Sequence, residues 1–360
     1  MGGRPVAAVR RHGEGKTMRV ALIITCMMTL VSACAVNPVT LEKEFMIISE
    51  QKEISIGERS DPVIVQEYGL YDDPGLQNYV DEVGQKLVQV CSRKNIDYHF
   101  KLLDTDEANA FALPGGYIYL TRGIMALMNS EAEMAGVLSH EIGHVVGRDS
   151  ANQISQQTWF QVVAIAGMAA SPSTRELAMA GNMLFNAVML GYGREKEFLA
   201  DSQGVEYMFR AGYDPLQMAR FLSTLGKIYQ GPAGYAQYLT THPFVTDRIN
   251  RAEAQAKVLT AMDDAFARRA IGSAGGAVPQ SKSGRVIRSD EFISRLDGLA
   301  YGSRDSIRRI KIYTVNEGDT LESLANDVVR GGQTVKEIAF MNGLDPAARL
   351  SAGQKLKLVL

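Results

Sequence analysis

The stretch "SEAEMAGVLSHEIGHVVGRD" (residues 130–149) predicts one helix that carries two of the chain's five histidines. Ser130 followed three residues later by Glu133 forms a capping-box pattern, which favours a helix start at this point. Apolar residues then recur at helical spacing: Met134, Val137, Leu138, Ile142 and Val145. Because His140 and His144 are four residues apart, they share one face of this helix and can bind one metal ion together.

A glutamate directly follows the first histidine. Glu141 lies about 100° around the helix from His140, so it can reach a water at the metal without being a third ligand. This is the HExxH pattern of zinc peptidases, in which zinc acidifies a water and the glutamate acts as general base. The alternative is a chance pairing of histidines on an ordinary helix.

The composition is that of an ordinary globular protein. The chain has 360 residues, 46% of them hydrophobic, and a formal net charge of -2. This length allows one large core and a small second domain. The charge gives no reason to expect nucleic acid as a partner.

The N-terminus is typical of an export signal. Lys16 and Arg19 precede the apolar run "VALIITCMMTLV" (20–31), which is too short for a membrane-spanning helix. The following "VSAC" resembles a bacterial lipobox, which implies cleavage before Cys34 and lipidation of that cysteine. The alternative is a cleaved secretory signal without lipid, and the true start is Met1 or Met18.

Cysteine usage excludes an intramolecular disulfide in the processed chain. Cys26 would leave with the signal and Cys34 would carry lipid, so only Cys91 would remain. We expect Cys91 to be a small buried hydrophobic residue.

Two β-rich segments lie ahead of the histidine helix. "YHFKLLD" (98–104) alternates apolar and polar residues, which predicts a half-buried strand with His99 facing solvent. In "NAFALPGGYIYLTRGIM" (109–125), we expect the strand that begins beside Pro114 to be an edge strand. Such an edge could receive an extended substrate, or it could be a plain surface hairpin.

The rest of the chain divides at a flexible stretch. Residues 154–192 are apolar and rich in methionine, and we expect core helices, with a substrate-gating lid or a membrane-surface contact as the alternative. "GSAGGAVPQSKSG" (272–284) is a linker. The predicted organisation is given by four segments: signal peptide 1–33, metallopeptidase domain 34–271, linker and connector 272–309, and a C-terminal module 310–360.

A third metal ligand is needed to complete the site. "GREKEFLADSQG" offers Glu197 and Asp201, four residues apart on one helix face. Glu197 can bind the ion while Asp201 accepts a hydrogen bond from the second ring nitrogen of a ligating histidine, which fixes the tautomer of that ring.

The chain resembles the HtpX-like and CAAX-prenyl-protease family of zinc metallopeptidases, particularly its periplasmic lipoprotein branch. The resemblance covers roughly residues 34–256 and rests on five segments in the family's order: "NPVT", "NAFALPGGYIYLTRG", "LSHEIGHVVGRD", "REKEFLAD" and "THPFVTDRI". It implies one Zn²⁺ per chain bound by His140, His144 and Glu197, with Glu141 as base and Asp201 behind a histidine. It also implies endoproteolysis of misfolded or stalled envelope proteins.

"THPFVTDRI" (241–249) bears on regulation. The resemblance implies that His242 can be a fourth zinc ligand, and our hypothesis is that it closes the resting site and moves before catalysis. His242 or Arg248 could also donate to the oxyanion of the reaction. The alternative is an exposed histidine in a helix-capping loop.

The C-terminal 48 residues resemble a LysM module. "YTVNEGDTLESLA", "MNGL" and "SAGQKLKL" match the start, middle and end of that family, with the order strand, helix, helix, strand. The resemblance implies binding of N-acetylglucosamine-containing glycans and a tether to peptidoglycan. The alternative is a degenerate module that only packs or binds protein.

Together these features predict an α+β protein: a mainly helical zincin-like domain with a small edge sheet, followed by a small βααβ domain. We expect a lipid-anchored periplasmic endopeptidase, sorted to the outer membrane because alanine follows Cys34. The rival hypothesis is a peptidoglycan-tethered chaperone or scaffold with a closed, non-catalytic zinc site. Prenyl-protein processing within a membrane fails because spanning helices are absent.

Overall fold

The computed structural model describes residues 34–168, 192–227, 237–243, 245–272, 284–304, 306, 308–330 and 332–360. The predicted leader (1–33), the second half of the methionine-rich region (169–191) and most of the linker (273–283) lie outside these residues. No helix within the described part is both long and apolar enough to cross a membrane.

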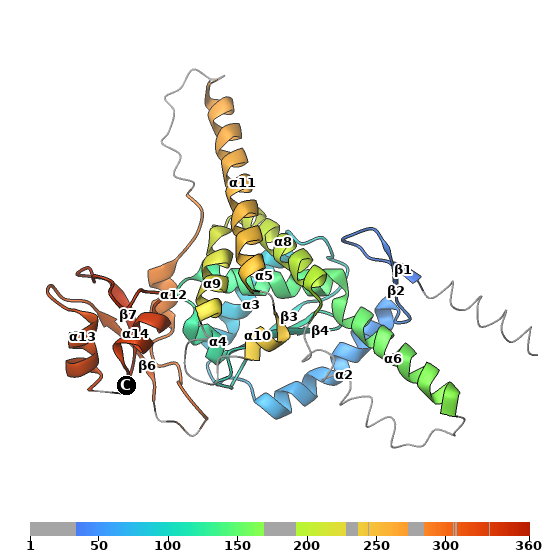
Figure 1. Ribbon diagram of the computed structural model, residues 1–360, viewed down its shortest axis with the longest axis horizontal. Coiled ribbons are helices and arrows are strands. Elements are labelled where there is room, and N and C mark those ends of the chain that lie inside the picture. Colours follow the sequence, from blue (N-terminus) through green and yellow to red (C-terminus); the bar gives the residue numbers. More distant parts are fainter. Residues whose placement is uncertain are drawn as a thin grey trace, which may run out of the picture.

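The described elements follow the predicted α+β class (Figure 1). The peptidase part contains β1 (Cys34–Val36), β2 (Lys43–Phe45), α2 (Glu50–Tyr68), α3 (Pro74–Val88), β3 (His99–Leu103), β4 (Ala110–Leu113), β5 (Tyr117–Thr121), α4 (Arg122–Leu127), α5 (Glu131–Gly147), α6 (Asp149–Met168), α8 (Arg194–Arg210), α9 (Leu216–Gly226), α10 (Gln237–Thr241), α11 (Val245–Gly272) and α12 (Ser289–Arg295). The C-terminal module contains β6 (Ile310–Thr314), α13 (Leu321–Ser323), the π-helical turn η2 (Leu324–Val328), α14 (Val335–Met341) and β7 (Lys355–Val359).

Helix α5 lies at the centre of the peptidase part. Its predicted start is confirmed, because Ser130 Oγ accepts a hydrogen bond from Glu133 N at 3.1 Å. Arg148 caps the C-terminus of the helix in a left-handed conformation (φ 54°), and its backbone N–H donates to the carbonyls of His144 and Val145. All residues of α5 are buried, not only the apolar stripe that the spacing indicates. A helix buried on every side needs internal partners for its polar residues.

A three-stranded sheet covers α5 in the order β3-β5-β4. Strand β3 pairs parallel with β5, and β4 pairs antiparallel with β5. The prediction that the strand after Pro114 is an edge is therefore wrong: β5 is central, and β3 and β4 are the outer strands. Pro114 lies in the turn, so its missing N–H interrupts neither ladder of β5. His99 is exposed at the start of β3, as predicted.

Helix α8 packs very closely on α5 because both contribute small residues at their crossing. A Cβ added to Gly143 would lie 2.9 Å from the Cα of Ala200, and one added to Gly204 would lie 3.2 Å from the amide nitrogen of His140. This approach brings the polar face of α8 against the histidine face of α5. Cys91 is buried and has a free thiol, as predicted.

The described part of the connector packs against the peptidase core. Phe292 of α12 is fully buried, and Val286 forms a β-bridge with Tyr213. Strands β6 and β7 of the C-terminal module pair antiparallel around its own small core. The β1–β2 hairpin and this module lie at opposite ends of the molecule (Figure 1).

Candidate metal centre

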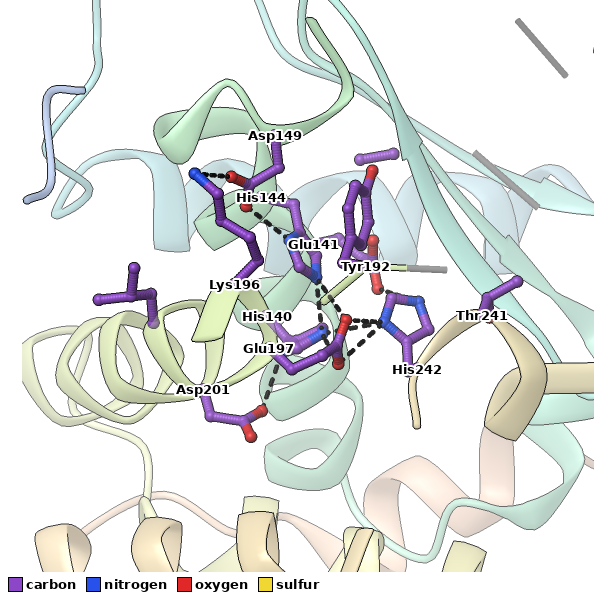
Figure 2. Close-up of polar contacts among 12 residues, drawn as sticks. His140, Glu141, His144, Asp149, Tyr192, Lys196, Glu197, Asp201, Thr241 and His242 are labelled. Atoms are coloured by element: carbon purple, nitrogen blue, oxygen red, sulfur yellow. Dashed lines mark hydrogen bonds and ion pairs between the residues drawn. The ribbon is translucent and has the colours of Figure 1, made fainter. Parts of the chain in front are cut away.

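Four buried side chains from three parts of the fold converge beside α5 (Figure 2). His140 and His144 come from α5, Glu197 from the first turn of α8, and His242 from the end of α10. One ligand atom from each can be chosen so that all lie within 4.8 Å of one another. The structure therefore brings together the four residues that the sequence proposed as metal ligands.

The spacing of these atoms fits a small tetrahedral ion. The Nε2 atoms of His140 and His144 are 3.0 Å apart, and His140 Nε2 is 3.2 Å from His242 Nδ1. Oxygens of Glu197 lie 3.2 to 3.5 Å from these nitrogens. Bonds of about 2.0 to 2.1 Å in a tetrahedron give ligand separations of about 3.3 Å, so this donor set fits zinc.

Carboxylates hold the other ring nitrogens of both α5 histidines. Asp201 Oδ1 lies 2.9 Å from Nδ1 of His140, in the role that its spacing from Glu197 predicted. Asp149 Oδ2 lies 2.9 Å from Nδ1 of His144. Both contacts favour a proton on Nδ1 and leave Nε2 free for metal. Sequence reasoning missed Asp149, which follows the end of α5 and is aimed back at His144 by the left-handed turn at Arg148.

Arg248, from α11, is fully buried behind the ligands. Its guanidinium binds Asp201 with Nε at 2.7 Å and a second nitrogen at 2.8 Å, and lies 2.6 Å from Glu197 Oε2. The guanidinium nitrogen that faces Glu197 also donates a hydrogen bond to the carbonyl oxygen of His242. These carboxylates and this carbonyl take most of its donors, which gives Arg248 a positioning role at the ligands, and its donation to the oxyanion stays a prediction.

The electrostatics of the cluster favour the metal-binding forms of Glu197 and His140, whereas His144 must lose a proton before it can bind a cation. Burial raises the pKa of Glu197, but Arg248 and His242 outweigh it and hold that pKa well below its ordinary value. Burial and Arg248 lower the pKa of His140. Burial also opposes protonation of His144, yet hydrogen bonds with Asp149 and Glu197 raise its pKa to about 10. An ionised carboxylate and a neutral imidazole are the forms that bind zinc.

Glu141 has a buried carboxylate without a hydrogen-bond partner among the described residues. Nε2 of His242 lies 3.5 Å from its Oε1. An unpartnered buried carboxylate costs free energy, and such groups persist where function requires them. The position beside the ligand cluster suits a base for a water at the metal.

Two tyrosines that the sequence did not single out flank the histidines. Tyr238 stacks on His242 with ring centroids 4.6 Å apart, and Tyr192 stacks on His144 at 4.1 Å. The hydroxyl of Tyr192 is 2.7 Å from Ser150 Oγ. His242 is 1% exposed, so it is not the exposed loop histidine of the alternative reading.

An HExxH helix with a glutamate from a second helix defines the metallopeptidase class of site. The chain belongs to peptidase family M48, whose pattern matches residues 74–256. Residues 313–359 match the LysM domain family.

Similar proteins carry protease names. The chain is 32% identical over 196 residues to the putative beta-barrel assembly-enhancing protease of Vibrio cholerae and 30% identical over 201 residues to the beta-barrel assembly-enhancing protease of Escherichia coli. These matches include 52% and 54% of this chain but only 40% and 41% of those relatives. It is 27% identical to the mitochondrial metalloendopeptidase OMA1 of Schizosaccharomyces pombe, over 60% of this chain and 64% of that protein.

Proposed function

We propose that this chain is a zinc-dependent endopeptidase that cleaves misfolded or stalled proteins of the bacterial cell envelope. The observation that carries the proposal is the unpartnered, fully buried carboxylate of Glu141 beside a four-donor cluster. A purely structural zinc site would have no use for this carboxylate. Its persistence therefore favours an enzyme over the scaffold alternative.

The residues divide the chemistry of peptide hydrolysis among them. When bound, zinc supplies Lewis acidity that lowers the pKa of a water and polarises the scissile carbonyl. Glu141 takes a proton from the attacking water and returns it to the leaving amine. Asp201 and Asp149 keep both α5 imidazoles oriented, and Arg248 fixes Glu197 and Asp201.

The resting site is proposed to be latent. His242 supplies a fourth protein donor at tetrahedral spacing, which would leave no position for a water. Displacement of the α10–α11 connection would remove this donor. His242 would then be free to donate to a substrate oxygen.

Substrates are proposed to bind as extended chains along β4. This strand is the outer strand of the sheet that lies nearest the metal centre, and the carbonyl of Ala110 lies 3.3 Å from Nε2 of His242. An extended peptide could add to the edge by backbone hydrogen bonds, independently of its sequence. Such recognition suits the proposed substrates, unfolded or misassembled envelope proteins, and agrees with bacterial relatives named beta-barrel assembly-enhancing proteases.

The location is proposed from the sequence. Export, lipidation at Cys34 and sorting to the inner leaflet of the outer membrane would place the enzyme in the periplasm. The LysM domain would hold it to peptidoglycan. Sedimentation of residues 35–360 with purified peptidoglycan, and release by soluble N-acetylglucosamine oligomers, would support the tether. Failure to sediment would indicate a LysM domain that only packs or binds protein.

Glu141→Gln tests the enzymatic proposal. We expect zinc content to stay at one per chain, while cleavage of unfolded casein falls at least about a hundredfold because the general base is lost. Glu195→Gln, on the exposed side of α8, is the matched control and should cleave normally. If zinc-loaded wild type and His242→Ala both leave casein intact, the scaffold alternative is correct.

A further inference from the structure

A chain of charged contacts continues outward from His144 beyond Asp149. Lys196 Nζ lies 3.0 Å from Asp149 Oδ1, the oxygen that does not face the imidazole, and 2.6 Å from Glu44 Oε1. Figure 2 shows the lysine reaching from α8 towards Asp149. The Asp149 side chain is 4% exposed, whereas Lys196 and Glu44 are 23% and 20% exposed. The contacts therefore run from the buried metal centre to the surface.

The outer end of this chain belongs to the β1–β2 hairpin. Asn37 Nδ2 donates to Glu44 Oε1 at 2.7 Å and lies 3.5 Å from the carbonyl of Gly147, in the last turn of α5. Asn37 Oδ1 accepts from the amide of Val39 at 2.8 Å, which fixes the turn between the strands. The hairpin therefore contacts the helices that supply three of the four metal ligands, α5 through Asn37 and α8 through Lys196.

Asp149 can orient His144 only if the carboxylate is itself held. It stands at the end of α5, after a left-handed residue, and its rotation is limited by what binds its second oxygen. Lys196 forms an ion pair with that oxygen at 3.0 Å, and Glu44 in turn accepts a hydrogen bond from the ammonium group at 2.6 Å. Removal of a direct partner of a ligating histidine, as Asp149 is of His144, typically changes metal affinity by about 10- to 100-fold, so a residue that holds such a partner is expected at or below the lower end of this range.

We propose that Lys196 and Glu44 are positioning residues through which the N-terminal hairpin orients the metal ligand His144. This inference rests on the proposed function only in taking the four-donor cluster as a zinc site. It adds a means of regulation. Any displacement of the hairpin would release Lys196 from Glu44, which would loosen Asp149 and with it the imidazole of His144. Zinc affinity thereby depends on a segment that contributes no ligand.

Lys196→Met tests the proposal in residues 34–360 by zinc affinity, measured in competition with a chromophoric chelator. We expect about tenfold weaker binding, with an altered visible spectrum of the Co²⁺-substituted protein. Lys101→Met is the matched control, because Lys101 forms an equally short, partly buried pair with Asp61 that does not contact the site. The control should bind zinc like wild type.

Two further variants keep the test independent of folding defects. Glu44→Gln should weaken zinc binding by about two- to fivefold, less than Lys196→Met, and Lys196→Arg should restore most of the affinity, because it keeps the charge. Wild-type affinity in both Lys196→Met and Glu44→Gln would overturn the proposal. So would equal losses in Lys196→Met and Lys101→Met. A wild-type chain that binds zinc but cleaves nothing would refute the proposed function, and the affinities would still decide this inference.

Discussion

Two buried basic side chains near α5 are held by different partners, one by carboxylates and the other by backbone carbonyls. Arg248, at the metal centre, binds two carboxylates that themselves contact metal ligands. Lys357, from β7 of the LysM domain, is equally buried, but its ammonium group donates to the carbonyls of Ala126 and Met128 at 2.7 and 2.6 Å. These carbonyls end α4 and precede α5, and burial lowers the pKa of the Lys357 nitrogen that binds them to about 7.

The difference shows what each cation does. At the metal centre the positive charge of Arg248 keeps the carboxylates of Glu197 and Asp201 ionised and in place. Glu197 can then bind the metal, and Asp201 can orient His140. At the domain junction Lys357 joins the two domains, because from a strand of the LysM domain it donates hydrogen bonds to backbone carbonyls of the peptidase part. Ile310, Met341 and Val359 of the module extend the peptidase core at the same junction. The LysM domain is therefore docked on α4 and α12 by apolar packing and a buried lysine.

The largest expected effect is that of Arg248→Met. Two buried carboxylates would lose their counter-charge, which we expect to cost about 3 to 5 kcal/mol of unfolding free energy and to weaken zinc binding. Urea unfolding and chelator competition measure the two effects. Arg93→Met, which breaks another buried pair with Glu53, should destabilise the fold but keep zinc affinity. If Arg248→Met lowered the free energy of unfolding by less than about 1 kcal/mol, the proposed role of Arg248 in holding Glu197 and Asp201 would be contradicted.

Lys357→Met should have the next largest effect, on the other side of the comparison. Two buried carbonyls would lose their donor, at a cost of about 2 to 3 kcal/mol, while zinc affinity and peptide cleavage stay unchanged. Hydrogen exchange of residues 122–130 would rise. Lys355→Met, on the same strand but bound only to Ser294 at the surface, is the control. Reduced zinc affinity in Lys357→Met would show that the domain junction and the metal centre are coupled, which would contradict the comparison.

Asp201→Asn should have the smallest effect of the three. The amide oxygen can still accept from His140, but the lost charge should weaken zinc binding about tenfold. Asp319→Asn, in the LysM domain, removes a carboxylate that accepts from Tyr313 and should leave zinc binding unchanged. Equal affinities in wild type and Asp201→Asn would mean that hydrogen-bond geometry alone orients His140.

Most of the metal centre was predictable because its residues form local patterns, whereas His242 was indicated only by the family resemblance. His140, Glu141 and His144 share one helix, and Glu197 and Asp201 share another, so spacing alone indicated their faces. The remaining features depend on contacts between distant segments. The bond of Lys196 to Glu44 spans 152 residues, and that of Lys357 to Ala126 spans 231. No periodicity within either segment reports such a pairing.

The sheet order was missed for a similar reason. Pro114 indicated correctly that a backbone donor is absent, but not on which side of the turn the unpaired strand would lie. Strand β5 is central because β3, from an earlier segment, pairs along its free side. Asp149 was missed because its role depends on the left-handed turn at Arg148, which the sequence does not specify.

X-ray absorption at the zinc edge tests the central claim, a closed four-donor site, most directly. Zinc-loaded wild type should show one ion per chain bound by three imidazoles and one carboxylate oxygen, with no sulfur. His242→Ala should lose one imidazole and gain an oxygen ligand. A chain that binds no zinc, or a first shell unchanged by His242→Ala, would contradict the account.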